Sequence, residues 1–266
     1  GSFHSLAIRS DGTLVGWGNN TYGQINTPSG VFTAIAAGSF HSLAIRSDGT
    51  LVGWGNNTYG QINTPSGVFT AIAAGSFHSL AIRSDGTLVG WGNNGNGEIN
   101  VPAGTFTAVA SNANANHSIA IRSDGTLIGW GDNNRGQTNV PSGTFTAVAA
   151  GYEFSLAIRS DGTLAGWGRN FENQTIVPSG TFIAVAAGTY HSLAIRSNPP
   201  VPDPALRLHT DSALKPGTNT WTIASDRRLK KNIEPLSGAL ERLLQLRGVT
   251  FQWLDPASQG GITGTQ

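Results

Sequence analysis

Short stretches in which successive residues alternate between two faces recur along the chain, separated by glycine-rich turns. In the stretch SFHSLAIR, residues 2–9, alternation places His4, Leu6 and Ile8 on one face and the residues between them on the other. A period of two residues is that of a β-strand, whereas a helix repeats every three to four residues. The pattern therefore predicts a chain of short strands.

The segments after this first strand predict further strands and turns. Ser10-Asp11-Gly12 favours a tight turn, because glycine accepts a positive φ and Asp caps the bend. A second strand follows in TLVGWG, and residues 24–26 are expected to form a short outer strand. FTAIAA, residues 32–37, is small and apolar, which is typical of a close-packed inner strand.

The whole pattern repeats with a period of 37 residues, and the first two copies are identical. The copies start at about Gly1, Gly38, Gly75, Asn112 and Gly151, and a partial sixth copy starts at Gly188. The fourth copy is two residues longer, in the stretch 112–116. Three or four short strands in a unit of roughly 40 residues are typical of a propeller blade.

One segment carries a specific resemblance. HSLAIRSDGTLVGWGNNTYGQ, residues 4–24, resembles the regulator-of-chromosome-condensation repeat in its bacterial form. The resemblance extends over residues 1–197 and implies an all-β fold, a β-propeller with blades of about 37 residues.

The number of strands of each type bears on how such a propeller closes. Five full repeats and a partial sixth contain six HSLAIR-type strands but five of each other type. A closed five-blade ring would leave one strand redundant, so a truncated larger ring explains the surplus more simply. The alternative fold is a trimeric fibre in which repeats from three chains wind together.

Composition narrows the classes of partner. The formal net charge is +1 and 12% of residues are charged, which gives no electrostatic basis for binding nucleic acid or an anionic membrane. The absence of cysteine excludes disulfides and Cys-ligated metals. The chain contains no apolar run of about 18 residues, so no transmembrane helix is predicted. Because the chain starts inside a repeat without an initiator Met, we expect an internal fragment of a longer protein.

Two rows of residues recur once per copy. The histidines are His4, His41, His78, His117 and His191, and Phe154 replaces histidine in the fifth copy. A ligand that Phe can replace is not essential, so we expect packed histidines hydrogen-bonded inside each blade, no metal and no cofactor. The tryptophans are Trp17, Trp54, Trp91, Trp130 and Trp167, and their invariance favours packing between blades over stacking on a ligand.

Differences between the copies gather in the polar loop after each Trp-Gly pair. The loop reads NNTYGQ twice, then NNGNGE, DNNRGQ and RNFENQ. Variable loops on a rigid scaffold are typical of recognition surfaces, and neutral drift at a solvated loop produces the same pattern. The candidate binding residues are Thr21, Tyr22, Thr58, Tyr59, Gly95, Asn96, Asn134, Arg135, Phe171 and Glu172. Near-identical copies would let a weak ligand bind by avidity.

The repeats give way to a proline-rich stretch. Residues 198–204 predict a stiff linker, and residues 205–224 predict a short β connector. A small α+β segment is expected to follow, with a helix that starts at Pro235 or Ser237 and ends at Gly248 before the strand VTFQW.

The segment after the connector carries a second resemblance. SDRRLKKNI resembles the intramolecular chaperone, or self-cleaving peptidase, domain that ends phage tail fibres and endosialidase tailspikes. The matching residues are Ser225, Asp226, Arg228, Leu229, Lys230, Asn232 and Ile233. The resemblance implies that residues 225–266 are the first part of a domain that forms a trimer, guides fibre folding and cuts itself off.

The resemblance also implies roles for two of these residues. Ser225 corresponds to the nucleophile and Lys230 to the general base, and the bond between Ala224 and Ser225 is the one cleaved. Serine becomes nucleophilic only when a base takes its proton, and lysine is a base only in its neutral form, which requires burial. By residue type alone, Ser225 and Asp226 favour an ordinary cap before a solvated basic cluster over a catalytic pair.

The combination of the two modules favours an attachment protein of a virion or a cell surface. The propeller would bind a surface receptor or glycan, the C-terminal domain would make a homotrimer, and chemistry would be limited to one self-cleavage. The alternative is a protein-interaction or nucleotide-exchange-factor propeller in the cytoplasm. A turnover enzyme is not expected, because the repeats offer no convergent acid–base set.

Overall fold

The computed structural model describes residues 1–197, together with residues 213–214, 222–223, 252–254 and 261–263. The chain divides into two compact units, Gly1–Ser197 and Asn198–Gln266. Every regular element described in the first unit is a β-strand, which confirms the all-β prediction. No described helix is long and apolar enough to span a membrane.

Three types of strand alternate through the first unit. The HSLAIR-type strands are β1 (His4–Ile8), β4 (His41–Arg46), β7 (His78–Arg83), β10 (His117–Arg122), β13 (Phe154–Arg159) and β16 (Ser192–Arg196). The LVGWG-type strands are β2 (Leu14–Gly18), β5 (Leu51–Gly55), β8 (Leu88–Gly92), β11 (Leu127–Gly131) and β14 (Leu164–Gly168). The FTAIAA-type strands are β3 (Phe32–Ala37), β6 (Phe69–Ala74), β9 (Phe106–Ala110), β12 (Phe145–Ala150) and β15 (Phe182–Ala187).

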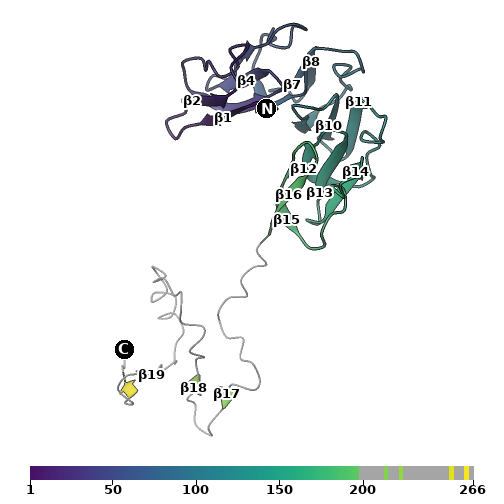
Figure 1. Ribbon diagram of the computed structural model, residues 1–266. Helices are drawn as coiled ribbons and strands as arrows, with labels where there is room; N and C mark the ends of the chain where they lie inside the picture. Colours follow the sequence, from purple (N-terminus) through teal and green to yellow (C-terminus); the bar gives the residue numbers. More distant parts are fainter. Residues whose placement is uncertain (198–212, 215–221, 224–251, 255–260, 264–266) are drawn as a thin grey trace. The chain divides into compact units, whose positions relative to one another are not determined.

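These strands form antiparallel sheets that are the blades of a β-propeller. The complete blades are β3-β4-β5, β6-β7-β8, β9-β10-β11 and β12-β13-β14, and they follow one another in a curved row (Figure 1). Each blade takes its FTAIAA strand from one copy and the other two strands from the next copy. The blades are therefore offset from the sequence repeats by one strand.

The two ends of the first unit carry incomplete blades. Within residues 1–197, strand β1 pairs with β2 alone and strand β15 pairs with β16 alone. In a five-blade ring, β1 would have to pair with β15. The sixth HSLAIR-type strand, β16, already occupies that place. Residues 1–197 do not close into such a ring.

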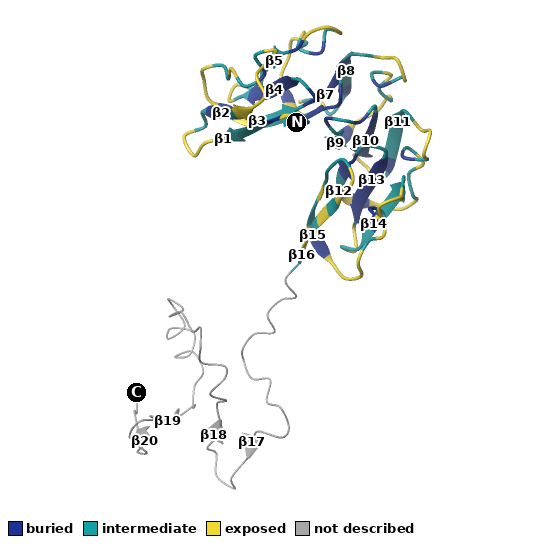
Figure 2. Cartoon of the chain, in the orientation of Figure 1, coloured by how far each residue is buried: buried dark blue, intermediate teal, exposed yellow. Residues whose placement is uncertain are grey.

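The middle strand of each complete blade is buried because both of its faces meet a neighbouring blade (Figure 2). Leu43 and Ile45 of β4 cluster with Ala81 and Trp91 of the next blade. The aliphatic side chains of one blade thus pack against a small residue, Ala81, and an indole, Trp91, of its neighbour. Full burial of each such aliphatic side chain stabilises the fold by about 1.5–3 kcal/mol.

The tight turn between β1 and β2 forms as expected. Asp11 Oδ1 accepts hydrogen bonds from the Thr13 hydroxyl at 2.7 Å and the Thr13 amide at 2.9 Å, and these bonds lower the pKa of the Asp11 carboxyl. Gly12 has a φ of 82°, in the left-handed region that side chains disfavour. The sequence pattern therefore placed this turn correctly.

Residues 24 and 25 form a turn and residue 26 is irregular, so the expected outer strand at this position is wrong. Asn20 Oδ1 accepts a hydrogen bond from the Ile25 amide at 3.1 Å, and Asn20 Nδ2 donates one to Asn26 Oδ1 at 2.8 Å. These side-chain bonds compete with strand pairing and hold the backbone as a loop. The complete blades consequently have three strands each.

One segment breaks the equivalence of the copies. Residues 112–116, which we call the hub segment, lie where the fourth copy is two residues longer. Asn114 Oδ1 accepts a hydrogen bond from Ser2 Oγ at 2.5 Å, and Asn114 Nδ2 donates one to Thr189 Oγ1 at 2.8 Å. Ser2 precedes β1 and Thr189 lies between β15 and β16, so the hub segment connects the two incomplete blades.

The second unit is described only at two strand pairs. Strand β17 (Ala213–Leu214) pairs with β18 (Thr222–Ile223), and β19 (Gln252–Leu254) pairs with β20 (Gly261–Thr263), both antiparallel. The expected linker at 198–204 and the expected helix from Pro235 or Ser237 to Gly248 lie outside the described residues.

Candidate functional site

The candidate binding residues lie in loops that leave the LVGWG strands. Strands β1 and β2 pair with His4 opposite Gly18 and Ile8 opposite Leu14. The loop after Gly18 therefore lies at the end of the blade opposite to the turn at Asp11. We call the end that carries these loops the loop face.

A buried glutamine supports each loop of the first two copies. Gln24 is fully buried, and its Nε2 donates to Asn19 Oδ1 at 2.7 Å. The amides of Thr21 and Tyr22 donate to Asn19 Oδ1 at 3.0 Å and to Gln24 Oε1 at 2.9 Å. The same bonds recur around Gln61. This scaffold fixes the backbone and leaves the Tyr side chain at the tip.

The tips of these two loops belong to a row of aromatic side chains. Tyr22 meets Phe40 with ring centroids 5.4 Å apart, and Phe40 stacks on Phe3 at 5.0 Å. Tyr59 meets Phe77 at 5.4 Å. We call these five residues the aromatic row. Phe3, Tyr22 and Tyr59 are each about half exposed, so the row offers ring faces and hydroxyl groups to a ligand.

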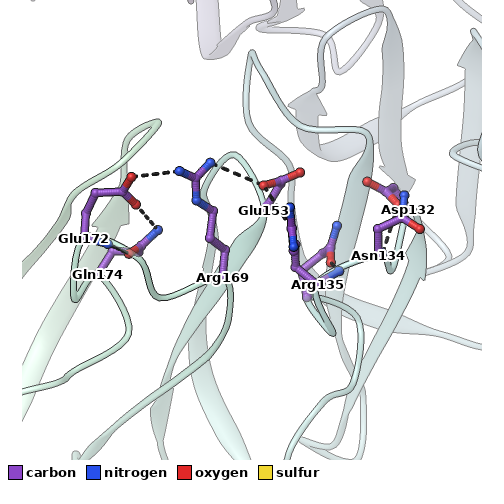
Figure 3. A network of polar contacts seen from close by, with 8 residues as sticks. Asp132, Asn134, Arg135, Glu153, Arg169, Glu172 and Gln174 are labelled. Carbon is purple, nitrogen blue, oxygen red and sulfur yellow. Dashed lines mark hydrogen bonds and ion pairs between the residues drawn. The ribbon is translucent and has the colours of Figure 1, made fainter.

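The loops of the fourth and fifth copies carry a charged cluster instead, which we define as Arg135, Glu153, Arg169 and Glu172 (Figure 3). Arg169 pairs with Glu172 at 2.7 Å and with Glu153 at 3.4 Å, and Arg135 lies 3.8 Å from Glu153. Two cations face two anions, so the cluster carries no net charge.

Aromatic rings surround the central arginine of this cluster. The Arg169 guanidinium lies 4.9 Å from the Tyr190 ring centroid, 5.0 Å from Phe171 and 5.9 Å from Tyr152. Phe171 also lies 5.3 Å from the Arg135 guanidinium and is strongly exposed. In the fourth and fifth copies, the loop face therefore carries an aromatic surface around Arg169, and ion pairs hold this arginine in place.

The third copy has the smallest loop tip. Glu98 replaces the supporting glutamine and remains fully buried, and its Oε2 accepts a hydrogen bond from the Asn96 amide at 2.7 Å. Because a carboxylate cannot donate, Asn93 turns its Nδ2 toward Glu98 Oε1 at 3.2 Å. Gly95 and Asn96 leave the tip without a large side chain.

The structure thus places all the predicted loop residues at equivalent tips but brings only some of them into shared surfaces. Tyr22 and Tyr59 join the aromatic row, whereas Arg135, Phe171 and Glu172 meet around Arg169. That these surfaces bind a ligand stays a prediction.

Sequence reasoning missed the aromatic partners that precede the HSLAIR strands. These are Phe3, Phe40 and Phe77 in the aromatic row and Tyr152 and Tyr190 beside Arg169. The available signal was an aromatic residue shortly before every HSLAIR-type strand except β10, in GSF, GYE and GTY. That residue lies far along the chain from the loop tip that it contacts.

His4, His41, His78 and His117 are buried as expected, whereas His191 in the incomplete last blade is exposed, and the hydrogen bonds of the buried four cross between blades and not within them. His4 Nε2 lies 2.9 Å from Ser42 Oγ of the next blade, and His41 Nε2 lies 3.0 Å from Ser79 Oγ. Among the described residues, no three His, Asp or Glu side chains gather as metal ligands. The histidine row therefore connects blades.

Trp54, Trp91, Trp130 and Trp167 pack between blades, which agrees with the sequence prediction, whereas Trp17 in the incomplete first blade is exposed. Trp54 Nε1 donates to the Gln24 carbonyl at 2.8 Å, and Trp91 Nε1 donates to the Gln61 carbonyl at 2.8 Å. Each carbonyl lies in the loop of the preceding copy. The loop that forms the candidate site is thus anchored by the next blade.

The predicted self-cleavage residues, Ser225 and Lys230, and the predicted scissile bond at Ala224 lie outside the described residues.

Four stacked three-stranded blades with shared loop geometry define a propeller built from sequence repeats. The sequence model of the regulator of chromosome condensation (RCC1) repeat matches this chain at residues 1–24, 32–61, 69–98, 106–137 and 145–174. The chain therefore belongs to the RCC1 repeat family. The model of the chaperone of endosialidase matches residues 225–265, which confirms the second resemblance. No curated protein matches the chain.

Solved structures agree on the fold. The ectodomain of the receptor kinase CR4 from Physcomitrella patens is 24% identical with a TM-score of 0.63, over 75% of this chain and 57% of that one. Prp20p from Saccharomyces cerevisiae is 19% identical with a TM-score of 0.62, over 74% and 68%. The ACR4 ectodomain from Arabidopsis thaliana is 19% identical with a TM-score of 0.59, over 73% and 74%. This chain spans little more than half of the first of these proteins.

Proposed function

We propose that this chain belongs to an attachment protein of a virion or a cell surface, in which the loop face of the propeller binds a surface glycan or receptor. The observation that carries the proposal is the combination, in one chain, of RCC1 repeats with a chaperone-of-endosialidase segment. A module related to fibre folding makes an exposed, fibre-borne binding domain the natural role for the repeats.

The aromatic row supports a glycan as the ligand. Tyrosine offers an apolar ring to the carbon–hydrogen face of a sugar and a hydroxyl group to its oxygens. Tyr22 and Tyr59 lie in identical loops one repeat apart, beside the polar side chains of Asn19 and Asn56. Two equal sites would suit a glycan with repeating units and would raise its affinity through avidity.

The test is binding of the full chain to a glycan array and to whole cells. The double variant Tyr22→Ala/Tyr59→Ala should bind at least about tenfold more weakly, because exposed tyrosines commonly dominate such interfaces. The control is Val31→Ala/Val68→Ala, which changes two half-exposed residues one repeat apart near the turns at the opposite end of the blades. Equal binding by all three proteins, or no binding by the wild type, would rule the proposal out.

We further propose a homotrimer formed through residues 225–266, followed by one cleavage between Ala224 and Ser225. Ser225 Oγ would attack the carbonyl carbon of Ala224 while Lys230 takes the hydroxyl proton and passes it to the Ser225 nitrogen as the C–N bond breaks. Water would then hydrolyse the resulting ester, giving the Ala224 carboxylate as the new C-terminus and restoring the Ser225 hydroxyl. The intact parent protein should shorten on expression, and Ser225→Ala should stay whole. A wild-type band that never shortens would refute the cleavage.

The second candidate is a cytoplasmic interaction or nucleotide-exchange propeller. It is supported by the shared fold of Prp20p, whose structure was reported with its binding properties to Gsp1p and histones. The net charge of +1 gives this chain little attraction for chromatin. Accelerated nucleotide release from a small GTPase, without any binding to cell surfaces, would favour this candidate.

A further inference from the structure

The incomplete blade β15-β16 exposes apolar residues that are buried elsewhere in the same fold. Leu193 of β16 is 63% exposed, whereas its counterpart in the preceding blade, Leu156 of β13, is 1% exposed. In that blade, β14 pairs with β13. Within residues 1–197, no strand pairs with the corresponding edge of β16.

A groove lies beside this free edge. It is a cavity of about 520 Å³, whose apolar lining includes Leu156, Leu164, Val177, Phe182, Val185 and Ala194. One repeat earlier, the equivalent residues surround Trp167, and they are Ile119, Leu127, Val140, Phe145, Val148 and Ala157. The groove therefore has the lining of a tryptophan site without the tryptophan.

The hydrogen-bonding groups of the groove are arranged in the same way. The Gln137 carbonyl accepts bonds from Ser155 Oγ at 2.9 Å and from Trp167 Nε1 at 2.8 Å. Its counterpart, the Gln174 carbonyl, accepts a bond from Ser192 Oγ at 2.6 Å. A carbonyl has two lone pairs, so Gln174 retains an acceptor position for an indole N–H.

We propose that this groove binds a β-strand of the type Leu-x-Gly-Trp-Gly from a separate polypeptide. The strand would add antiparallel to β16 and complete the blade, as β14 completes β13. The β14 register places Trp opposite Ser192 and Leu opposite Ile195. The indole would fill the groove and donate to the Gln174 carbonyl. One end of the groove adjoins the loop face, because Glu172 and Tyr190 also line it, but the proposal does not depend on the function proposed for the loop face.

Among the strands that the structure describes, those of the Leu-x-Gly-Trp-Gly type argue for a separate source. Strands β5, β8, β11 and β14 are already paired within their own blades. Strand β2 carries an exposed tryptophan, Trp17, but it is paired with β1, which is a copy of β16. A second copy could supply β2 only by breaking that pairing. A free strand from another polypeptide meets no such cost.

The test is calorimetric titration of the full chain with a synthetic peptide of the sequence of residues 47–57, which contains one Leu-x-Gly-Trp-Gly strand. We expect one peptide per chain. The Trp54→Ala peptide should bind at least about tenfold more weakly, since it cannot fill the groove. The variant Leu193→Lys should lose binding to a similar extent. Ile183→Lys is the matched control, because Ile183 on β15 is 68% exposed and does not line the groove.

Three results would overturn the proposal. The first is no binding of the wild-type peptide, and the second is equal binding by Leu193→Lys and the wild type. The third is self-association of the wild-type chain, seen by sedimentation, that Leu193→Lys abolishes, because a second copy would then cover the groove. A trimer formed through residues 225–266 would be unaffected by Leu193→Lys, so it is distinguishable from this third result.

Discussion

At the scale of single residues, the buried histidines have a defined proton position. Ser79 Oγ donates to the Gln61 carbonyl at 2.8 Å, so His41 Nε2 must donate the bond that joins it to Ser79 Oγ. Nδ1 is then an unprotonated acceptor. The Nδ1 atoms of His4, His41, His78 and His117 are all buried without a partner. Each neutral histidine thus connects two blades through its Nε2 proton.

This arrangement predicts sensitivity to acid. Burial lowers the pKa of His41 and His117 to about 3 and that of His78 to about 4. In the unfolded chain the pKa is about 6.5. The unfolded state therefore binds more protons below that pH, so stability is full above about pH 6.5 and is lost as the pH falls toward the folded values.

The variant His78→Phe tests this origin of the acid sensitivity, and the chain already holds Phe154 at the equivalent position. Removal of one titrating group should reduce the loss of unfolding free energy between about pH 7 and about pH 4.5 by about 2 kcal/mol. Urea unfolding at both pH values measures this difference. An equal loss in the variant and the wild type would contradict the assignment.

At the scale of elements, each LVGWG strand anchors its blade on the loop of the preceding copy. Trp130 and Trp167 donate to the carbonyls of Glu98 and Gln137, both at 2.8 Å. The bond needs only the main-chain carbonyl, so it survives the replacement of Gln by Glu98. The bond from the indole N–H to the loop carbonyl therefore both holds successive blades together and fixes the shape of the loop face.

The variant Trp91→Phe should lower the free energy of unfolding by about 2 kcal/mol, because it removes the bond to the Gln61 carbonyl and leaves that acceptor short of a partner. The matched control is Trp17→Phe, which changes the same residue in an identical strand where the indole is 53% exposed. Its effect should stay within about 0.5 kcal/mol. Thermal or urea unfolding decides the case, and equal effects of the two substitutions would refute the anchoring role.

The strands themselves could be predicted because alternation in SFHSLAIR and the Asp11-Gly12 turn depend on neighbouring residues. The error at residues 24–26 arose because Asn20 bonds the backbone of Ile25, and a pattern of apolar positions does not register such competition. The sequence also did not reveal that the blades are offset from the repeats by one strand. A repeat can be cut at any point without changing its period, whereas strand pairing fixes one boundary.

At the scale of the whole molecule, the candidate site was predictable only in part. Variation between copies located the loop tips at Tyr22 and Phe171, because each copy can be compared with the others. The partners of those tips come from other copies. Tyr22 meets Phe40 of the next copy. Phe171 lies beside the Arg169 guanidinium, which also faces Tyr190 of the next copy. The contacts between copies exist only once the blades are stacked.

Near-identical modules raise a problem of order during folding, since any FTAIAA strand could pair with the wrong HSLAIR strand at little cost. The hub segment gives the fourth copy an identity that the others lack. Its Asn114 reaches the first and sixth copies, and its Ala113 carbonyl accepts a bond from Ser39 of the second copy. An arrangement with the copies permuted would leave these groups without partners. The one irregular repeat therefore selects the correct sequence of blades among arrangements that the regular repeats alone could not tell apart.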